Sequence, residues 1–134
     1  MSELRQADRL PSPIVNSENQ AFWQAAQAGK LILKLCHSCE EVHYYPRTIC
    51  PHCGSKDTTW VNSDGLGEIY SFTVMRRGVE FPFAMAYVLL NEGISLLTHL
   101  TNCNFDAIRI GQKVKVVFQE TQDGQNTHVF EPLN

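Results

Sequence analysis

The stretch Cys36-His37-Ser38-Cys39, followed ten residues later by Cys50-Pro51-His52-Cys53, decides the fold of this 134-residue chain. Two C-x-x-C pairs at this spacing let two short turns each offer two thiolates to one tetrahedral ion. Four sulfur ligands leave no vacant coordination position, so we expect a structural ion that does not activate water. The sequence therefore predicts one structural zinc ion, with iron, which the same sulfur set can hold, as the less favoured alternative.

Short apolar segments flank the cysteine pairs and complete a small ribbon. Residues Leu31–Leu35 predict a strand that runs into the first pair, and Val42–Tyr45 predict its return strand. The turn-rich segment Asn62–Gly67 then marks a boundary between the ribbon and the rest of the chain.

The segment before the ribbon predicts an extended arm and one short helix. Pro11 and Pro13 exclude a regular helix or a central strand within residues 1–15. Residues Ser17–Gln20 fit a capping box, and Gly29 suits a helix C-terminus. So short a helix is marginal on its own. Its aromatic residues Phe22 and Trp23 therefore need a surface to cover, on this chain or on a partner.

The sequence after the ribbon predicts five strands. Tyr70, Phe72 and Val74 alternate with polar neighbours and predict a strand with one apolar face. Residues Phe83–Leu90 are apolar on both faces, as in a central strand, and Glu92-Gly93 predicts a tight turn into the next strand. The remaining predicted strands lie near residues 94–101, 113–119 and 127–130. Five strands suit a small Greek-key barrel of the OB-fold type, with an open sandwich as the alternative.

The predicted organisation is therefore mainly β, in three parts. Residues 1–29 form the arm and helix, residues 30–61 the zinc ribbon, and residues 62–134 the five-stranded OB-fold barrel. The chain has 11 basic and 14 acidic residues and a net charge of −3, a poor match for nucleic acid. It contains no apolar run of the roughly 20 residues that a membrane helix needs, and no signal-peptide pattern. We expect a cytoplasmic protein with reduced thiols.

Catalytic motifs are missing from the sequence. It has no glycine-rich phosphate loop, no G-x-S-x-G and no H-E-x-x-H, and its carboxylates show no paired spacing. Cys103, the fifth cysteine, is read as a small hydrophobic residue, although a pairing with His99 is the conceivable nucleophile. The sequence thus predicts no catalytic residue and argues against a self-sufficient enzyme.

Basic and aromatic residues suggest two kinds of contact with other molecules. Arg47, Arg76 and Arg77 lie near aromatic residues and are candidates for binding a phosphate-bearing ligand, with plain solvent exposure as the alternative. The ribbon and helix carry more large aromatics than so small a unit can bury, so some are expected to contact a partner protein. The partner candidates are Phe22, Trp23, Tyr44 and Tyr45.

The order of these features resembles the DUF35 proteins, and the resemblance covers nearly everything after residue 15. The matching segments, which follow one another along the chain, are Phe22-Trp23, Gly29-Lys30-Leu31, Cys36–Cys39, Pro46-Arg47, Cys50–Ser55, Gly67–Thr73 and Ile110–Phe118. Glu40-Glu41 depart from the pattern, because basic or polar residues are common at those positions. The segment Arg76–Pro82 is not diagnostic of a subgroup.

The resemblance implies a rubredoxin-like zinc ribbon joined to an OB-fold, in a non-catalytic accessory subunit. Such subunits assist assembly and CoA-substrate handling beside thiolase-like acyltransferases, ketothiolases or MaoC-like enoyl-CoA hydratases. For this chain the resemblance thus implies an enzyme partner and contact with acyl-CoA. Two alternatives stay open, a single-strand nucleic-acid-binding protein of ribbon-plus-barrel type and a rubredoxin-like electron carrier with iron at the four sulfurs.

Overall fold

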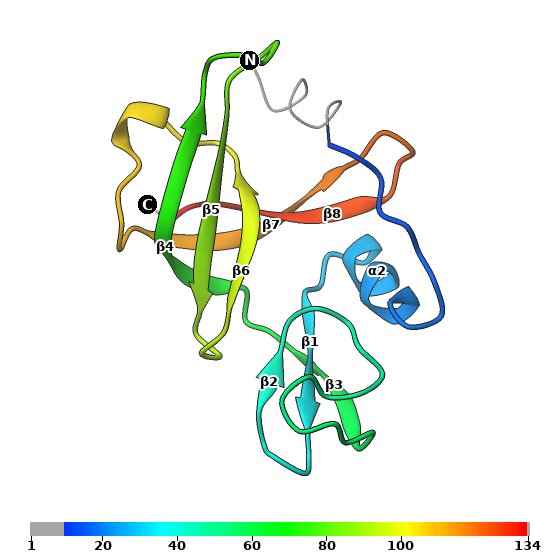
Figure 1. Ribbon diagram of the computed structural model, residues 1–134. Coiled ribbons are helices and arrows are strands. Elements are labelled where there is room, and N and C mark those ends of the chain that lie inside the picture. Colours follow the sequence, from blue (N-terminus) through cyan, green and yellow to red (C-terminus); the bar gives the residue numbers. More distant parts are fainter. Residues whose placement is uncertain (1–9, 134) are drawn as a thin grey trace.

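Residues 10–133 are described by a computed structural model of the chain, which contains a small sheet, a closed barrel and one α-helix between them (Figure 1). The small sheet has the strand order β2-β1-β3, and the barrel has the order β4-β5-β6-β8-β7. The sheet strands are β1 (Ile32–Cys36), β2 (Val42–His43) and β3 (Thr58–Asn62). The barrel strands are β4 (Leu66–Met75), β5 (Phe83–Leu90), β6 (Ser95–Leu100), β7 (Lys113–Glu120) and β8 (Asn126–Pro132). This arrangement confirms the mainly β fold with a ribbon and a five-stranded barrel, and excludes the open sandwich.

Helix α2 (Gln20–Gln27) begins later than the sequence predicts. Its N-cap is Asn19, not Ser17, and the Asn19 side chain makes no hydrogen bond to the helix, because it is engaged with Asn16 in the preceding turn. The Asn16 amide donates to Asn19 Oδ1 at 2.8 Å, and the Asn19 amide donates to Asn16 Oδ1 at 3.0 Å. The predicted end is confirmed, since Gly29 has a φ of 79°, where glycine avoids the steric cost that a Cβ incurs. The arm is described from Leu10 onward, and residues 1–9 of the predicted arm lie outside the described residues.

Strand β4 contains a bulge that the alternating pattern did not reveal. Ile69 pairs with Val88 and Ser71 pairs with Tyr87, so Tyr70 is the extra residue between them. A bulge shifts the facing of all residues on one side of it. Tyr70 is therefore exposed on the outer face of the barrel, which corrects the prediction that it shares an inward face with Val74.

Strand β5 is central, as predicted, because it pairs with both β4 and β6. It is not buried on both faces, however. Ala84, Ala86, Val88 and Leu90 point into the core, whereas Tyr87 and Leu89 are exposed on the outer face. The reason is that Tyr87 and Leu89 lie on a side of the sheet that nothing within residues 10–133 covers, so an apolar run does not by itself guarantee burial.

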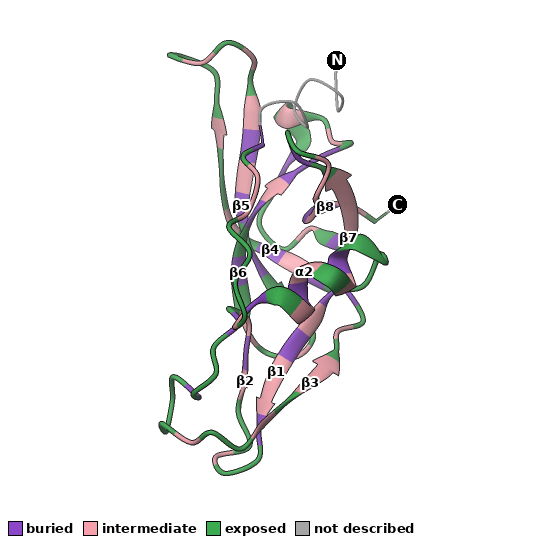
Figure 2. Ribbon diagram, turned by 90° about the vertical axis from the view of Figure 1, so that its right-hand side faces the viewer, coloured by how far each residue is buried: buried purple, intermediate pink, exposed green. Residues whose placement is uncertain are grey.

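The core is shared by the barrel, the helix and the ribbon. Buried side chains of Phe22 from α2 and of Leu31 and Leu33 from the ribbon join the barrel residues in one apolar cluster. In Figure 2 the loops of the ribbon are mostly exposed, whereas β1, α2 and the barrel strands contain buried residues. Within residues 10–133 no helix is long and apolar enough to cross a membrane.

Gly67 is required by the close approach of β4 to β5. A Cβ built there would lie 2.5 Å from the Leu89 carbonyl oxygen, a backbone atom that cannot rotate away. We expect Gly67→Ala to lower the free energy of unfolding by about 2–3 kcal/mol, since strand separation must increase. Urea unfolding measures this loss. Gly78→Ala is the control, because a Cβ at Gly78 would meet no neighbouring atom. Its positive φ of 74° is the one source of strain, so this change should lower the free energy of unfolding by about 1 kcal/mol. Equal losses would contradict the steric argument.

Candidate metal centre

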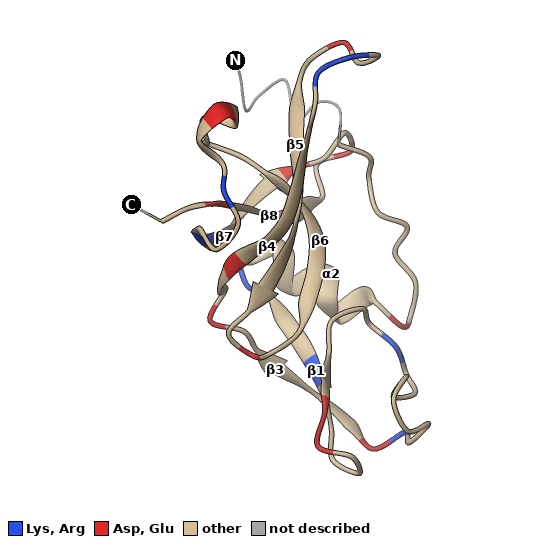
Figure 3. Cartoon of the chain, turned by 60° about the vertical axis from the view of Figure 1, so that its left-hand side comes forward, with Lys and Arg blue, Asp and Glu red and all other residues tan. Residues whose placement is uncertain are grey.

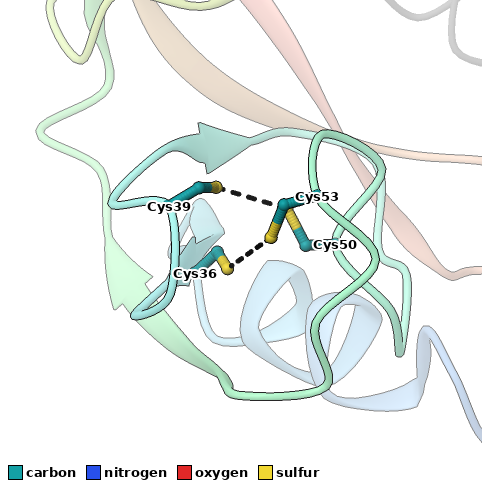
Figure 4. A group of neighbouring side chains, drawn as sticks. All are labelled: Cys36, Cys39, Cys50 and Cys53. Carbon is teal, nitrogen blue, oxygen red and sulfur yellow. Dashed lines mark hydrogen bonds between the residues drawn. The ribbon is translucent and has the colours of Figure 1, made fainter.

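The four cysteine side chains predicted as ligands converge at one end of the small sheet (Figure 4). Their sulfur atoms all lie within 4.8 Å of one another, and the Cys36–Cys53 and Cys39–Cys50 pairs are 3.6 Å and 3.7 Å apart. A tetrahedral ion with metal–sulfur bonds of about 2.3 Å requires sulfur–sulfur distances of about 3.8 Å. The residues therefore fit a four-sulfur ion, and they are positioned to bind a metal.

Two equivalent turns present the cysteines. In the first, the Glu40 amide donates to the Cys36 carbonyl and the Cys36 amide to the Glu41 carbonyl. In the second, the Gly54 amide donates to the Cys50 carbonyl and the Cys50 amide to the Ser55 carbonyl. The repeated C-x-x-C sequence thus folds into two copies of one hydrogen-bonded turn, and each copy aims two sulfurs at the same point.

The two turns differ at the residue after the second cysteine of each pair. Glu40 has a φ of 62° and Gly54 a φ of 82°, so both backbones are left-handed. A left-handed conformation costs a residue with a Cβ about 1 kcal/mol, and glycine is free of that cost. Glu40 is thus a strained residue at the place where its counterpart is glycine.

This difference predicts opposite effects of two substitutions. We expect Glu40→Gly to raise the free energy of unfolding by about 0.5 kcal/mol, because the steric relief exceeds the entropy that glycine loses on folding. The reciprocal change Gly54→Ala should lower it by about 1 kcal/mol. Thermal unfolding of the zinc-loaded protein tests both, and a destabilised Glu40→Gly variant would show that the Glu40 side chain has another role.

Electrostatics prepare the site for a cation. Backbone N–H groups of Cys39 and Ser38 hold the pKa of Cys36 below its ordinary value, at about 6. Burial, and the neighbouring sulfur atoms, raise the pKa of Cys39 to about 12. The His52 amide also donates to Cys50 Sγ at 3.3 Å. The lowered pKa of Cys36 favours its thiolate, which is the form of cysteine that binds a metal ion.

A second group of residues joins the ribbon to the barrel, and sequence reasoning missed its centre. Tyr44 Oη lies 2.8 Å from His128 Nε2, and the centroids of the two rings are 5.5 Å apart. Phe22 packs edge-on against both rings, and the ring centroid of Trp23 lies 6.2 Å from that of His128. Burial lowers the pKa of His128 to about 4 and raises that of Tyr44. A histidine in an alternating strand carries no signal of this role.

These contacts between the ribbon, the helix and the barrel correct part of the predicted partner surface. Phe22 is buried in the shared core, and the Tyr44 hydroxyl is engaged with His128, so neither presents a free aromatic ring to a partner. Both residues were predicted from aromatic content alone, which cannot distinguish a contact within the chain from a contact with a partner protein. Trp23 is partly exposed and Tyr45 is 51% exposed, so these two remain available.

The three candidate arginines do not form one site. Arg47 is in the ribbon, where its guanidinium carbon lies 4.6 Å above the Tyr45 ring. Arg76 and Arg77 lie in the hairpin between β4 and β5, which extends away from the ribbon at the other end of the molecule (Figure 1). Arg76 already pairs with Asp106 at 2.8 Å. Arg47 and the hairpin arginines could therefore not bind one phosphate together.

Comparisons with known proteins cover both parts of this architecture. Residues 23–59 match a family described as "ChsH2, rubredoxin-like zinc ribbon domain", and residues 60–119 match "ChsH2, C-terminal OB-fold domain". A DUF35 domain-containing scaffold protein of Methanothermobacter thermautotrophicus is 32% identical over 105 residues, which are 71% of this chain and 79% of that protein. The chain belongs to the DUF35 family. This confirms the resemblance inferred from the order of its motifs.

Three further proteins are similar to this DUF35 chain over most of its length. A probable enoyl-CoA hydratase alpha subunit of Thermomonospora curvata is 33% identical over 126 residues, 91% of this chain. The chain spans only 40% of that relative's length. A solved structure named "Ltp2-ChsH2(DUF35) aldolase" superposes with a TM-score of 0.78 at 33% identity, and covers 90% of this chain and 98% of that one. A Sulfolobus solfataricus DUF35 structure, at 19% identity and a TM-score of 0.63, shares the fold.

Proposed function

We propose that this DUF35 chain is a non-catalytic accessory subunit of an acyl-CoA enzyme complex, with a thiolase-like acyltransferase or ketothiolase, or a MaoC-like hydratase, as its partner. One observation carries the proposal. Nine-tenths of the chain is similar to part of a probable enoyl-CoA hydratase alpha subunit and to a chain of an Ltp2-ChsH2(DUF35) aldolase, and 71% of it is similar to a scaffold protein. A unit that recurs beside different enzymes supplies something those enzymes share, and assembly and handling of the CoA substrate are such tasks.

The metal in this proposal is a single zinc ion. Cys36, Cys39, Cys50 and Cys53 would hold it, and a closed set of four sulfurs supplies a structural crosslink and no open position for a substrate. Iron in the same sulfur set is the competing occupant. Metal analysis distinguishes the two, since zinc-loaded protein is colourless and an iron–sulfur centre absorbs visible light.

The ribbon, the helix and the barrel are held in a fixed arrangement by contacts within the chain. Glu18 in the arm accepts a hydrogen bond from the Thr48 amide in the ribbon, and Gln125 Nε2 in the barrel donates to the Trp23 carbonyl in the helix. Ribbon, helix and barrel are thereby connected to each other by polar contacts as well as by their shared core. A rigid connection of this kind suits a subunit that must keep two surfaces at a fixed separation.

Copurification from the native host, without an affinity tag on the chain, tests the proposal. Mass spectrometry of the co-eluting proteins and metal analysis are made on the same sample. We expect a thiolase-like or hydratase subunit to elute with the chain, with about one zinc per copy. The name of that subunit then defines the reaction.

Three outcomes would overturn the proposal. Elution of the chain alone, under conditions that preserve known weak complexes, would remove the accessory role. Salt-dependent co-elution with nucleic acid would favour the oligonucleotide-binding alternative, because phosphate contacts weaken as salt rises. A coloured protein with one iron per chain would favour the electron carrier.

A further inference from the structure

We propose that the outer face of β4, β5 and β6 is the interface of a homodimer, occupied by the same face of a second copy of this chain. This inference is independent of the proposed accessory role. The outer face is defined by the side chains that β4, β5 and β6 turn away from the core. Its apolar and aromatic members include Tyr70, Met75, Phe83, Met85, Tyr87, Leu89, Leu97 and His99, and its polar members include Glu68, Ser71, Thr73 and Ser95.

The register of the strands brings these side chains together. Tyr87 in the central strand pairs with Ser71 on β4 and with Leu97 on β6, so the three lie in one row across the sheet. The bulge at Tyr70 turns a tyrosine outward beside this row. Bulges commonly redirect a side chain at a functional surface, and a tyrosine is a frequent anchor in interfaces.

The outer face is mostly apolar, with three serine or threonine side chains and one charged residue. Figure 3 shows β4, β5 and β6 in front of the rest of the chain, and Glu68 is the one charged residue in these three strands. Glu68 is paired with Lys113 at 2.9 Å. A nucleic acid would need a cationic groove here, so this face suits a protein surface.

The exposed area is of the size that a dimer needs. The exposed fractions are 66% for Tyr70, 47% for Tyr87, 47% for Leu97, 43% for Met75 and 36% for Leu89. With roughly 150–250 Å² for a whole aromatic side chain and roughly 60–120 Å² for a leucine or methionine, these five offer roughly 250–400 Å². A standard interface takes roughly 800 Å² from each partner, of which roughly 450 Å² is apolar. The five exposed residues and the three half-buried members together account for most of that apolar share.

The charges at the two ends of the face favour a second copy as the occupant. The β4–β5 hairpin carries Arg76, Arg77 and one carboxylate, Glu80. The opposite end of the sheet carries Asp64 and Glu92, whose carboxylates accept hydrogen bonds within the chain and have no cationic partner in the part of it that the structure describes. Arg76 pairs with Asp106, and none of the ion pairs among residues 10–133 involves Arg77. When two copies pack face to face with antiparallel strands, the Arg77 of each copy approaches the acidic end of the other. In a two-fold symmetric dimer this contact between Arg77 and the acidic end occurs twice, once for each copy.

Sedimentation velocity of the zinc-loaded full chain tests the proposal. From about 1 µM to about 100 µM we expect a concentration-dependent species of twice the 15.2 kDa chain mass. Leu97→Glu should weaken dimerisation at least about 100-fold, because it buries an unpaired charge at the centre of the interface. Tyr70→Ser, a milder change at an exposed position, should weaken it at least about 10-fold.

Ile14→Glu is the matched control. Ile14 is an exposed apolar residue in the arm and lies outside the outer face, so this variant should dimerise like the parent protein. A parent chain that stays monomeric at every concentration would overturn the proposal. So would dimerisation that Leu97→Glu and Tyr70→Ser leave unchanged, since the contact would then use another surface. Protection of β5 and β6 amides from hydrogen exchange only after addition of an enzyme subunit would assign the face to that subunit instead.

Discussion

Cys50→Ser is expected to abolish metal binding and to unfold the ribbon. Cys50 is buried, and its sulfur lies 3.7 Å from Cys39 Sγ, so a serine leaves an incomplete set of ligands around the ion. Binding of zinc to sites of this kind is worth on the order of 10 kcal/mol and is coupled to folding. Metal analysis should show a fall from about one ion per chain to almost none.

The damage should extend into the barrel. Leu33 of the ribbon is part of the barrel's apolar cluster, and Tyr44 contacts His128 on β8, so an unfolded ribbon exposes core surface. Amide NMR spectra should lose the ribbon signals and show shifts along β8. Cys103→Ala is the control, because Cys103 is half-buried outside the sulfur cluster and should leave the metal content unchanged. A Cys50→Ser protein that keeps its zinc would contradict the assignment of the ligands.

The second large effect is a loss of stability in mild acid, caused by His128. Burial holds the pKa of folded His128 at about 4, against 6.5 for an ordinary histidine. Below pH 6.5 the unfolded chain therefore binds a proton that the folded chain does not. The free energy of unfolding should fall as the pH drops from 6.5 towards 4, by about 2 kcal/mol between pH 7 and pH 5 and about 3 kcal/mol in total. Above pH 6.5 His128 adds no pH dependence.

The double variant Tyr44→Phe/His128→Phe isolates this contribution. It replaces both members of a buried hydrogen bond by rings of similar shape, which is close to neutral when no polar atom is left unpaired. Urea unfolding at a series of pH values should show the steep acid loss in the parent protein and a shallower one in the variant. Protonation of the cysteine ligands and of His43 affects both proteins, so it cancels in the difference. Parallel curves would show that His128 does not cause the loss.

Much of the architecture could be predicted from local patterns. The two C-x-x-C pairs and their ten-residue spacing predicted the metal ribbon, because cysteine ligands close together in sequence need only short turns to converge. Gly29 predicted the end of α2, and Glu92-Gly93 predicted the turn between β5 and β6. Each of these features depends on interactions within a few residues, which is why the order of residues is sufficient to predict it.

Other features depend on residues that are distant in sequence. The bulge at Tyr70 depends on the pairing of β4 with β5, so the alternating pattern placed this residue on the wrong face. Phe22 and Tyr44 were predicted to contact a partner, and they contact His128 instead, 84 positions after Tyr44. The three arginines were separated because the ribbon and the β4–β5 hairpin lie at opposite ends of the molecule.

The sequence by itself determined the ribbon, its four candidate ligands, the number of barrel strands and the family to which the chain belongs. Only the tertiary structure decided which apolar and aromatic side chains are internal and which are exposed. The physical reason is that an apolar residue is favoured wherever it loses contact with water, and its type does not specify what covers it. The core covers Phe22, whereas Tyr87 lies on an outer face that we propose a second copy covers.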